Sequence, residues 1–326
     1  MCTRVVYSGS NGMVATGRSM DWKTDMHSNL WVFPRGMKRN GETGENSLEW
    51  TSRYGSVVTS AFEIASTDGM NEKGLVANLL WLPETECPVR DKNKPGLAIT
   101  AWVQYMLDNF ATVEEAVAYI DEDTFQVVSD MMPDGSRLAT LHLSISDATG
   151  DCAIFEYIGG KLTVYHSKEY KVMTNSPTYN KQLALSEYWK SIGGLNFLPG
   201  TNRAADRFAR ASFYINALPE TDDERIAVAR VFSVVRNASV PYGISTPESP
   251  EISTTQWRTV SESKNLRYFF ESSLTPNTFW VNLKDFDLSE GAPVFKLSIA
   301  NGEMYHGNTA KNFKTALPFK FMGVKG

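Results

Sequence analysis

Cysteine is scarce in this sequence. Its 326 residues include three cysteines, at positions 2, 87 and 152. A small, odd number argues against a disulfide framework and leaves at least one free thiol. Basic runs are also absent, and 32 Lys and Arg stand against 37 Asp and Glu, for a net charge of −5. Such a chain offers no electrostatic footprint for nucleic acid or an anionic membrane surface, so we expect neither as a partner.

Apolar runs long enough to span a bilayer are missing, and no secretory signal pattern precedes Cys2. We therefore expect a periplasmic protein if a leader has been removed, and a cytoplasmic one otherwise. The sequence has no G-x-G-x-x-G, P-loop, G-x-S-x-G or H-E-x-x-H motif. Its four histidines lack metal-ligand spacing, and His142 is interpreted as an ordinary surface or hydrogen-bonded histidine. We expect no metal and no cofactor.

Predicted strands and helices come in alternating blocks. Two apolar runs flank a turn-rich segment at 68–74, and a meander covers 139–167, with Gly159-Gly160 as a tight turn. A further set of strands is expected between 257 and 294. Periodicity predicts helices over 97–110, 112–120, 180–192, 203–218 and 224–237. No linker or repeat divides the chain, so we expect one α+β domain over 1–326, with helices covering sheets.

The chain begins with a predicted hairpin, "MCTRVVYSGSNGMVATGRSMDW". Asn11-Gly12 is a strong signal for a two-residue type I′ turn, because both central positions need a positive φ. A two-residue loop places Cys2 opposite Asp21 and Val5 opposite Arg18. Strict alternation puts Arg18 and Asp21 on opposite faces, so we expect a bulge near Gly17 if both are to serve Cys2.

The position of Cys2 suggests chemistry. Removal of Met1 would leave one residue with a thiol and a free α-amine, and both groups exchange protons near neutral pH. Nucleophile and general base then belong to the same residue. The structural alternative is a small buried side chain that opens a strand.

Five sequence blocks carry a family resemblance over essentially the whole chain. They are "MCTR" at the start, "GRSMDW" at 17–22, "DGMNEKGL" at 68–75, "MTNSPTY" at 173–179 and "DRFARASFY" at 206–214. With these blocks in this order, the sequence resembles the choloylglycine hydrolase family of N-terminal-nucleophile, linear-amide C–N hydrolases. The resemblance implies a four-layer αββα sandwich and cleavage of an amide through a thioester on the terminal cysteine.

The resemblance also implies roles for six catalytic residues. Cys2 resembles the nucleophile, and Arg18 and Asp21 the pair that orients and activates it. Asn175 and the backbone N–H of Trp81 resemble the oxyanion donors, and Arg207 a second active-site arginine. The structural alternatives are exposed ion pairing for Arg18 and Asp21, a turn residue for Asn175, and a solvated helix charge for Arg207.

Trp22 and Trp81 follow two of these blocks directly. They resemble the Gram-negative branch of the family, in which aromatic residues surround the acyl group. We expect both tryptophans to line the acyl pocket, with plain core packing as the alternative, and Met20, Met131 and Met132 to add an adaptable apolar wall.

The resemblance points to acyl amides as substrates, with penicillin V and N-acyl homoserine lactones leading. Conjugated bile salts are the alternative for the same chemistry. A non-catalytic binding or stress-response protein on this scaffold is the alternative from another class, favoured if Met1 is retained. Family members are commonly tetramers, while the short segment between Lys190 and Phe208 argues against that assembly. A homotetramer and an assembly other than a tetramer therefore both remain alternatives.

Overall fold

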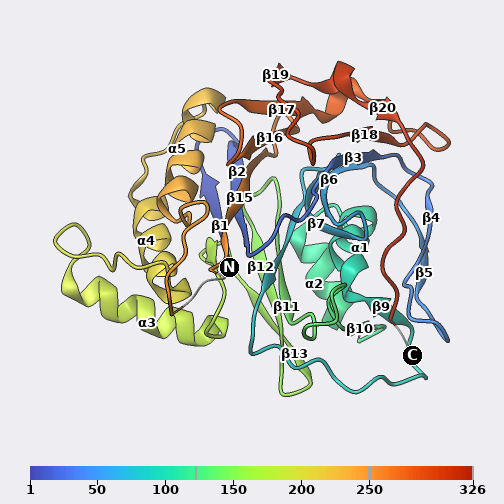
Figure 1. Ribbon diagram of the computed structural model, residues 1–326, viewed down its shortest axis with the longest axis horizontal. Coiled ribbons are helices and arrows are strands. Elements are labelled where there is room, and N and C mark those ends of the chain that lie inside the picture. Colours follow the sequence, from blue (N-terminus) through green and yellow to red (C-terminus); the bar gives the residue numbers. More distant parts are fainter. Residues whose placement is uncertain (122, 249–251, 325–326) are drawn as a thin grey trace.

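Two large sheets lie face to face at the centre of this computed structural model, which describes residues 1–121, 123–248 and 252–324. Figure 1 shows α3, α4 and α5 outside one sheet and α1 and α2 outside the other. The helices are α1 (Trp102–Asn109), α2 (Val113–Asp121), α3 (Tyr179–Ile192), α4 (Ala204–Ala217) and α5 (Glu224–Asn237). The order of layers is therefore helix, sheet, sheet, helix, as the family resemblance implied.

The seven-stranded sheet contains both strands of the predicted hairpin. Its order is β14 (Val172–Met173), β1 (Cys2–Ser8), β2 (Val14–Trp22), β15 (Thr254–Glu262), β16 (Arg267–Ser272), β17 (Thr278–Asn282) and β19 (Gly307–Asn308). Every neighbouring pair is antiparallel except β17 and β19. Helix α5 packs on β1, β2 and β15, and α4 packs on β1 and β14. The amino-terminal strand is thus central and covered.

The nine-stranded sheet is antiparallel throughout. Its order is β13 (Lys161–His166), β12 (Cys152–Ile158), β11 (Leu141–Ser146), β8 (Val76–Trp81), β7 (Ala65–Asn71), β6 (Ser56–Ala61), β3 (Leu30–Phe33), β18 (Phe295–Leu297) and β20 (Lys314–Thr315). Two small pairs are β4 (Lys38–Asn40) with β5 (Glu49–Thr51), and β9 (Gly96–Ala98) with β10 (Gln126–Val128). Short 3₁₀ turns cover Ile99–Ala101, Leu283–Asp285 and Ala310–Asn312.

Two large hydrophobic cores fill the spaces between the layers of the described structure. One fills the space between the sheets and extends under α4 and α5, with Met20, Leu80 and Val231 among its buried members. The other lies between the nine-stranded sheet and α1 and α2, with Trp102 and Phe155 buried in it. No helix in the described ranges is long and apolar enough to cross a membrane.

The predicted helices are present with small shifts at their ends. Residues 96–98 form β9 and 99–101 a 3₁₀ turn, so the helix expected from 97 begins at Trp102. At the start of α2, the Glu115 N–H donates to Thr112 Oγ1 (3.2 Å), and the Glu115 carboxylate accepts from the Ala111 N–H (2.9 Å).

The turn predicted at 68–74 is shorter than expected. Residues up to Asn71 belong to β7, which pairs with β6 and β8, and the turn covers only the last three residues. Asn71 remains buried because its side chain donates to the carbonyls of Leu107 and Phe110 and accepts from the Lys73 and Leu75 N–H groups. Polar residues that find buried partners are compatible with a central strand.

Candidate active site

The turn of the amino-terminal hairpin has the predicted conformation. Asn11 and Gly12 have φ values of 51° and 74°, and the Met13 N–H donates to the Ser10 carbonyl (3.1 Å). The next hydrogen bond differs from a two-residue hairpin, because Gly9, not Ser10, donates to the Met13 carbonyl (2.7 Å). The Ser10 N–H donates instead to the Thr221 carbonyl (3.3 Å). One extra residue therefore precedes the turn.

This extra residue shifts the register by one, so the predicted pairing is wrong. Cys2 lies opposite Met20, and Val5 opposite Gly17. The bulge expected near Gly17 is also absent, since β1 and β2 pair without interruption. Gly17 has a different role: a Cβ there would lie 2.4 Å from Val231 of α5. The glycine lets α5 approach β2.

The thiol of Cys2 lies on the face of the hairpin that carries Arg18 and Met20. Cys2 is buried, with Arg18 Nη2 at 3.7 Å and Met20 Sδ at 3.8 Å from its sulfur. Arg18 itself donates to the carbonyls of Thr67 (2.6 Å) and Leu79 (2.8 Å). The Arg18 guanidinium is therefore held in contact with the Cys2 sulfur.

Asp68 compensates the charge of Arg18 between the two sheets, with Asp68 Oδ2 3.6 Å from Arg18 Nη1. Its carboxylate accepts hydrogen bonds from Tyr268 (2.5 Å), Asn78 (2.6 Å) and Thr259 (3.3 Å). Burial raises the pKa of the Asp68 carboxyl, while Arg18 and these donors act against burial. The sequence block around Asp68 was interpreted as a turn, and nothing local in the sequence indicated its contact with Arg18.

Asp21 lies on the other face and reaches the backbone of the terminus. The Asp21 N–H donates to the Met1 carbonyl (2.8 Å), and the Met1 amine donates to the Asp21 carbonyl (2.7 Å). Thr255 donates to Asp21 Oδ1 (2.6 Å), but buried Oδ2 has no hydrogen-bond partner among the described residues. Its nearest cation is Arg207 Nη1, at 3.9 Å. Burial lowers the pKa of the Met1 amine, and Arg207 and Arg18 lower it further against the opposing charges of Cys2 and Asp21.

Arg207 of α4 holds the backbone of Cys2. Its Nη1 donates to the Cys2 carbonyl (2.5 Å) and to Thr3 Oγ1 (2.6 Å), and its Nη2 donates to Asn175 Oδ1 (2.7 Å). Arg207 is fully buried, so the interpretation as a solvated helix charge is wrong. Burial lowers the pKa of its guanidinium, while Asp21 and Cys2 oppose that shift. These hydrogen bonds from Arg207 fix the position of the Cys2 backbone.

Asn175 connects Cys2 with Trp81. Its Oδ1 accepts from the Cys2 N–H (2.7 Å), and its Nδ2 donates to the Trp81 carbonyl (2.6 Å). The Leu82 N–H donates to Thr140 across the β8–β11 ladder, so alternation points the N–H and carbonyl of Trp81 away from β11. The Trp81 N–H therefore lies on the same edge of β8 as the Asn175 amide.

Residues that the sequence did not single out hold the segment around Asn175. Gln182 of α3 donates to the carbonyls of Asn175 (3.1 Å) and Ser176 (2.9 Å). His142, interpreted from the sequence as an ordinary histidine, is buried between Glu156 (3.0 Å) and the Thr174 carbonyl (2.9 Å). The contacts of His142 join positions 14 and 32 residues apart in the chain, which local sequence patterns do not reveal.

An apolar pocket opens beside the Cys2 sulfur. Its lining includes Arg18, Met20, Trp22, Trp81 and Met132, and its cavity measures about 90 Å³. The rings of Trp22 and Trp81 are half-buried, with centroids 5.4 Å apart.

Met131 is not part of this pocket. It forms an isolated bridge with Leu138, and bridge partners point to the same face; both side chains are exposed, at 43% and 44%. Alternation then turns Met132 inward and Met131 outward, so the prediction for Met131 is wrong.

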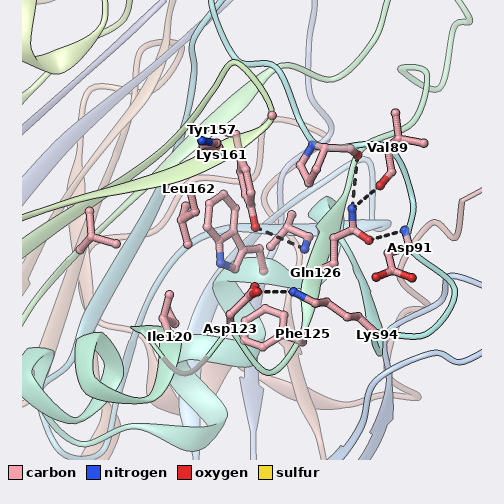
Figure 2. A pocket seen from close by; sticks show the side chains of 15 residues that line it. Val89, Asp91, Lys94, Ile120, Asp123, Phe125, Gln126, Tyr157, Lys161 and Leu162 are labelled. Atoms are coloured by element: carbon pink, nitrogen blue, oxygen red, sulfur yellow. Dashed lines mark hydrogen bonds and ion pairs between the residues drawn. The ribbon is translucent and has the colours of Figure 1, made fainter.

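A larger cavity, of about 420 Å³, opens at the edge of the second core, near α2, β10 and β12 (Figure 2). Lys94 is paired there with Asp123, and Gln126 bonds to the Asp91 N–H and the Val89 carbonyl. None of the predicted site residues lines it. Among the described residues, no group of three or more His, Cys, Asp or Glu side chains is arranged to hold a metal ion.

Comparison with known proteins agrees with this geometry. Residues 2–296 match the family of linear amide C–N hydrolases, choloylglycine hydrolase family. The chain belongs to this family.

Its relatives include penicillin V acylase from Pectobacterium atrosepticum, 50% identical over 99% of this chain and 92% of that protein. The structure of penicillin V acylase from Agrobacterium tumefaciens superposes with a TM-score of 0.93, at 56% identity over 99% of this chain and all of the other. A bile salt hydrolase/transferase from Clostridium perfringens is 27% identical over 79% of this chain and 84% of its own length. The chain is accordingly a hydrolase of linear amides with a four-layer N-terminal-nucleophile fold.

Proposed function

We propose that this enzyme cleaves aryloxyacetyl and fatty acyl amides, with penicillin V and N-acyl homoserine lactones as leading substrates. The observation that carries the proposal is the aromatic pocket beside the Cys2 sulfur, formed by Trp22 and Trp81 and closed by Met20 and Met132. Aromatic rings and thioethers contact both phenoxy groups and alkyl chains favourably. The two relatives named as penicillin V acylases support the same assignment.

The size of the pocket adds a condition. About 90 Å³ is small beside the roughly 300–1,000 Å³ of pockets that enclose drug-sized ligands. A phenoxyacetyl group therefore requires the walls to move. Met132 lies on the hairpin of residues 131–139 and has an unbranched side chain, so it is the wall element that yields most easily.

The proposed reaction begins with a proton transfer within Cys2. The thiol gives its proton to the free α-amine, and the sulfur attacks the amide carbonyl carbon. The second N–H of the Asn175 amide and the N–H of Trp81 donate to the resulting oxyanion. The Cys2 ammonium then protonates the departing nitrogen as the C–N bond breaks. Water then attacks the thioester carbonyl carbon and gives a proton to the amine. The C–S bond breaks, the acid leaves, and the Cys2 ammonium returns its proton to the sulfur.

This chemistry needs the Met1–Cys2 peptide bond to be cleaved first. While Met1 is attached, the Cys2 nitrogen is an amide N–H that donates to Asn175. After cleavage it becomes an amine with additional donor capacity, and Asp21 Oδ2 is a buried acceptor to which no group in the described part of the chain donates. We infer that Asp21 takes this hydrogen bond and orients the amine, and that Arg207 holds the Cys2 carbonyl.

An amine-release assay on three substrate classes tests the proposal. The protein is used after mass spectrometry has shown that Cys2 is the first residue. We expect turnover of penicillin V and of a long-chain acyl homoserine lactone above that of glycine-conjugated bile salts. Turnover of bile salts alone would replace the proposed substrate class with the alternative. No turnover of any of the three by the processed protein would contradict the proposal.

A further inference from the structure

Arg137 covers the tryptophan pair of the pocket. Its guanidinium carbon lies 4.9 Å from the centroid of the Trp81 ring and 5.7 Å from that of Trp22. The arginine is exposed and the tryptophans are half-buried, so the guanidinium lies on the solvent side of the rings.

The hairpin of residues 131–139 fixes this position. The Met132 N–H donates to the Arg137 carbonyl (2.7 Å), and Met131 and Leu138 form a bridge. The same short element thus supplies Met132 and Pro133 to the pocket wall and Arg137 to the rim.

Within residues 1–121, 123–248 and 252–324, no acidic side chain is in ion-pair contact with this guanidinium. Hydrogen bonds from Ser136 lower the pKa of the nearby Asp134 carboxyl, and the charges of Lys23 and Arg137 lower it further. Asp134 is the nearby acid on the same hairpin, and its fully exposed carboxylate accepts from the Ser136 N–H (2.9 Å). A guanidinium stacked on aromatic rings keeps its N–H donors free at the edge of its plane, in a fork that matches a carboxylate.

We propose that Arg137 binds a carboxylate on the amine half of the substrate. This inference rests on the proposed function, in which the acyl half fills the apolar pocket and Trp81 supplies an oxyanion donor. The amine half must then extend from the Cys2 sulfur toward solvent, past the rings that Arg137 covers. The preferred substrates are acyl amides whose amine half carries a carboxylate, on the α-carbon in an amino acid and across the fused rings in the penicillin nucleus. An acyl homoserine lactone, which has a neutral ring there, gains nothing from Arg137.

Two matched substrates isolate the charge: phenoxyacetyl-glycine, which ends in a carboxylate, and phenoxyacetyl-glycinamide, which ends in a neutral amide. The measured quantity is the ratio of kcat/KM for the two in the processed enzyme. We expect the R137Q substitution to lower this ratio about fivefold, mainly through KM of the acid, as for a partly exposed ion pair. R137K should keep part of the preference, because it keeps the charge and loses the planar fork.

Arg53 offers a matched control. It is also exposed and lies over an aromatic ring, with its guanidinium carbon 5.5 Å from the centroid of Tyr54, and it does not line the pocket. R53Q should leave the ratio unchanged. A second measurement needs no variant: raising the salt from about 0.05 to about 0.5 M should reduce the preference of the unmodified enzyme for the acid, because salt screens exposed charges.

The outcomes separate the inference from the function on which it rests. If the unmodified enzyme cleaves both amides and R137Q leaves the ratio within twofold, Arg137 does not read the carboxylate. A ratio that is insensitive to salt leads to the same conclusion. If the unmodified enzyme cleaves neither amide, the proposed function itself fails.

Discussion

Replacing Asn175 by aspartate tests whether Asn175 acts as an oxyanion donor or only supports the structure. Asn175 Oδ1 accepts from the Cys2 nitrogen and from Arg207, both at 2.7 Å, and an aspartate oxygen can do the same. The new negative charge lies against buried Arg207, which compensates it. N175D therefore keeps the acceptor side of the residue and removes only the Nδ2 donors.

The substitution should therefore change both the free energy of unfolding and the activation free energy of the reaction. The Trp81 carbonyl loses its 2.6 Å hydrogen bond and faces a carboxylate oxygen instead, which should lower the free energy of unfolding by about 1–3 kcal/mol. The melting temperature should then fall by about 2–10 °C. The oxyanion loses a donor, and the removal of one such donor costs about 3 kcal/mol, or roughly 100- to 1,000-fold in kcat.

The assay measures kcat and KM for penicillin V together with thermal melting. We expect a fall in kcat of at least 100-fold, a KM within about threefold, and a modest loss of stability. Asn216 provides the matched control, because it is exposed on α4 and its amide also donates to a backbone carbonyl, that of Ser212 (2.9 Å). A kcat for N175D within tenfold of the unmodified enzyme would refute the role of Asn175. So would a fall in melting temperature above 10 °C, because the residue would then serve the fold.

Four further predictions follow from the same site. Cys2→Ala and Cys2→Ser should nearly abolish amide hydrolysis with little change in melting temperature, because the sulfur is the proposed nucleophile. A protein that retains Met1, verified by mass spectrometry, should be folded and inactive, since its Cys2 nitrogen is an amide. Truncating Trp22 or Trp81 to alanine should lower kcat/KM more for phenoxyacetyl than for acetyl amides, with a stability loss below the ~3–5 kcal/mol of a core tryptophan. Gly17→Ala should lower the free energy of unfolding by about 1–3 kcal/mol in a denaturant titration, because α5 must move away.

Each of these has its own contradicting result. Substantial hydrolysis by Cys2→Ala excludes the thiol as nucleophile, and full activity with Met1 attached excludes the amine as base. Equal losses on both acyl amides, with a large drop in melting temperature, would make the tryptophans core residues. Gly200 has open space around its Cα, so Gly200→Ala is the control for Gly17→Ala. Equal stabilities of these two variants would show that α5 does not depend on Gly17.

Much of the site could be predicted from sequence patterns that act locally. Asn11-Gly12 favours positive φ values at two adjacent positions, and the turn forms where those residues stand. Alternation in a strand predicts opposite faces for Arg18 and Asp21, and the structure has them so. The five family blocks implied the αββα layers and the linear-amide hydrolase class, because all five rarely occur together in this order by chance, although any one of them alone is a weak signal.

The tertiary structure decided what those patterns left open. The hairpin register depends on whether the Ser10 N–H bonds to Met13 or to Thr221, and Thr221 lies more than 200 residues away in the segment between α4 and α5. No local preference encodes that choice, although it moves Cys2 from Asp21 to Met20. In this register the Cys2 thiol contacts Arg18 of β2, and the Cys2 carbonyl accepts a hydrogen bond from Arg207 of α4. Such contacts arise only when separate layers pack together, because packing, unlike a turn or an alternation, depends on residues that are distant in the chain.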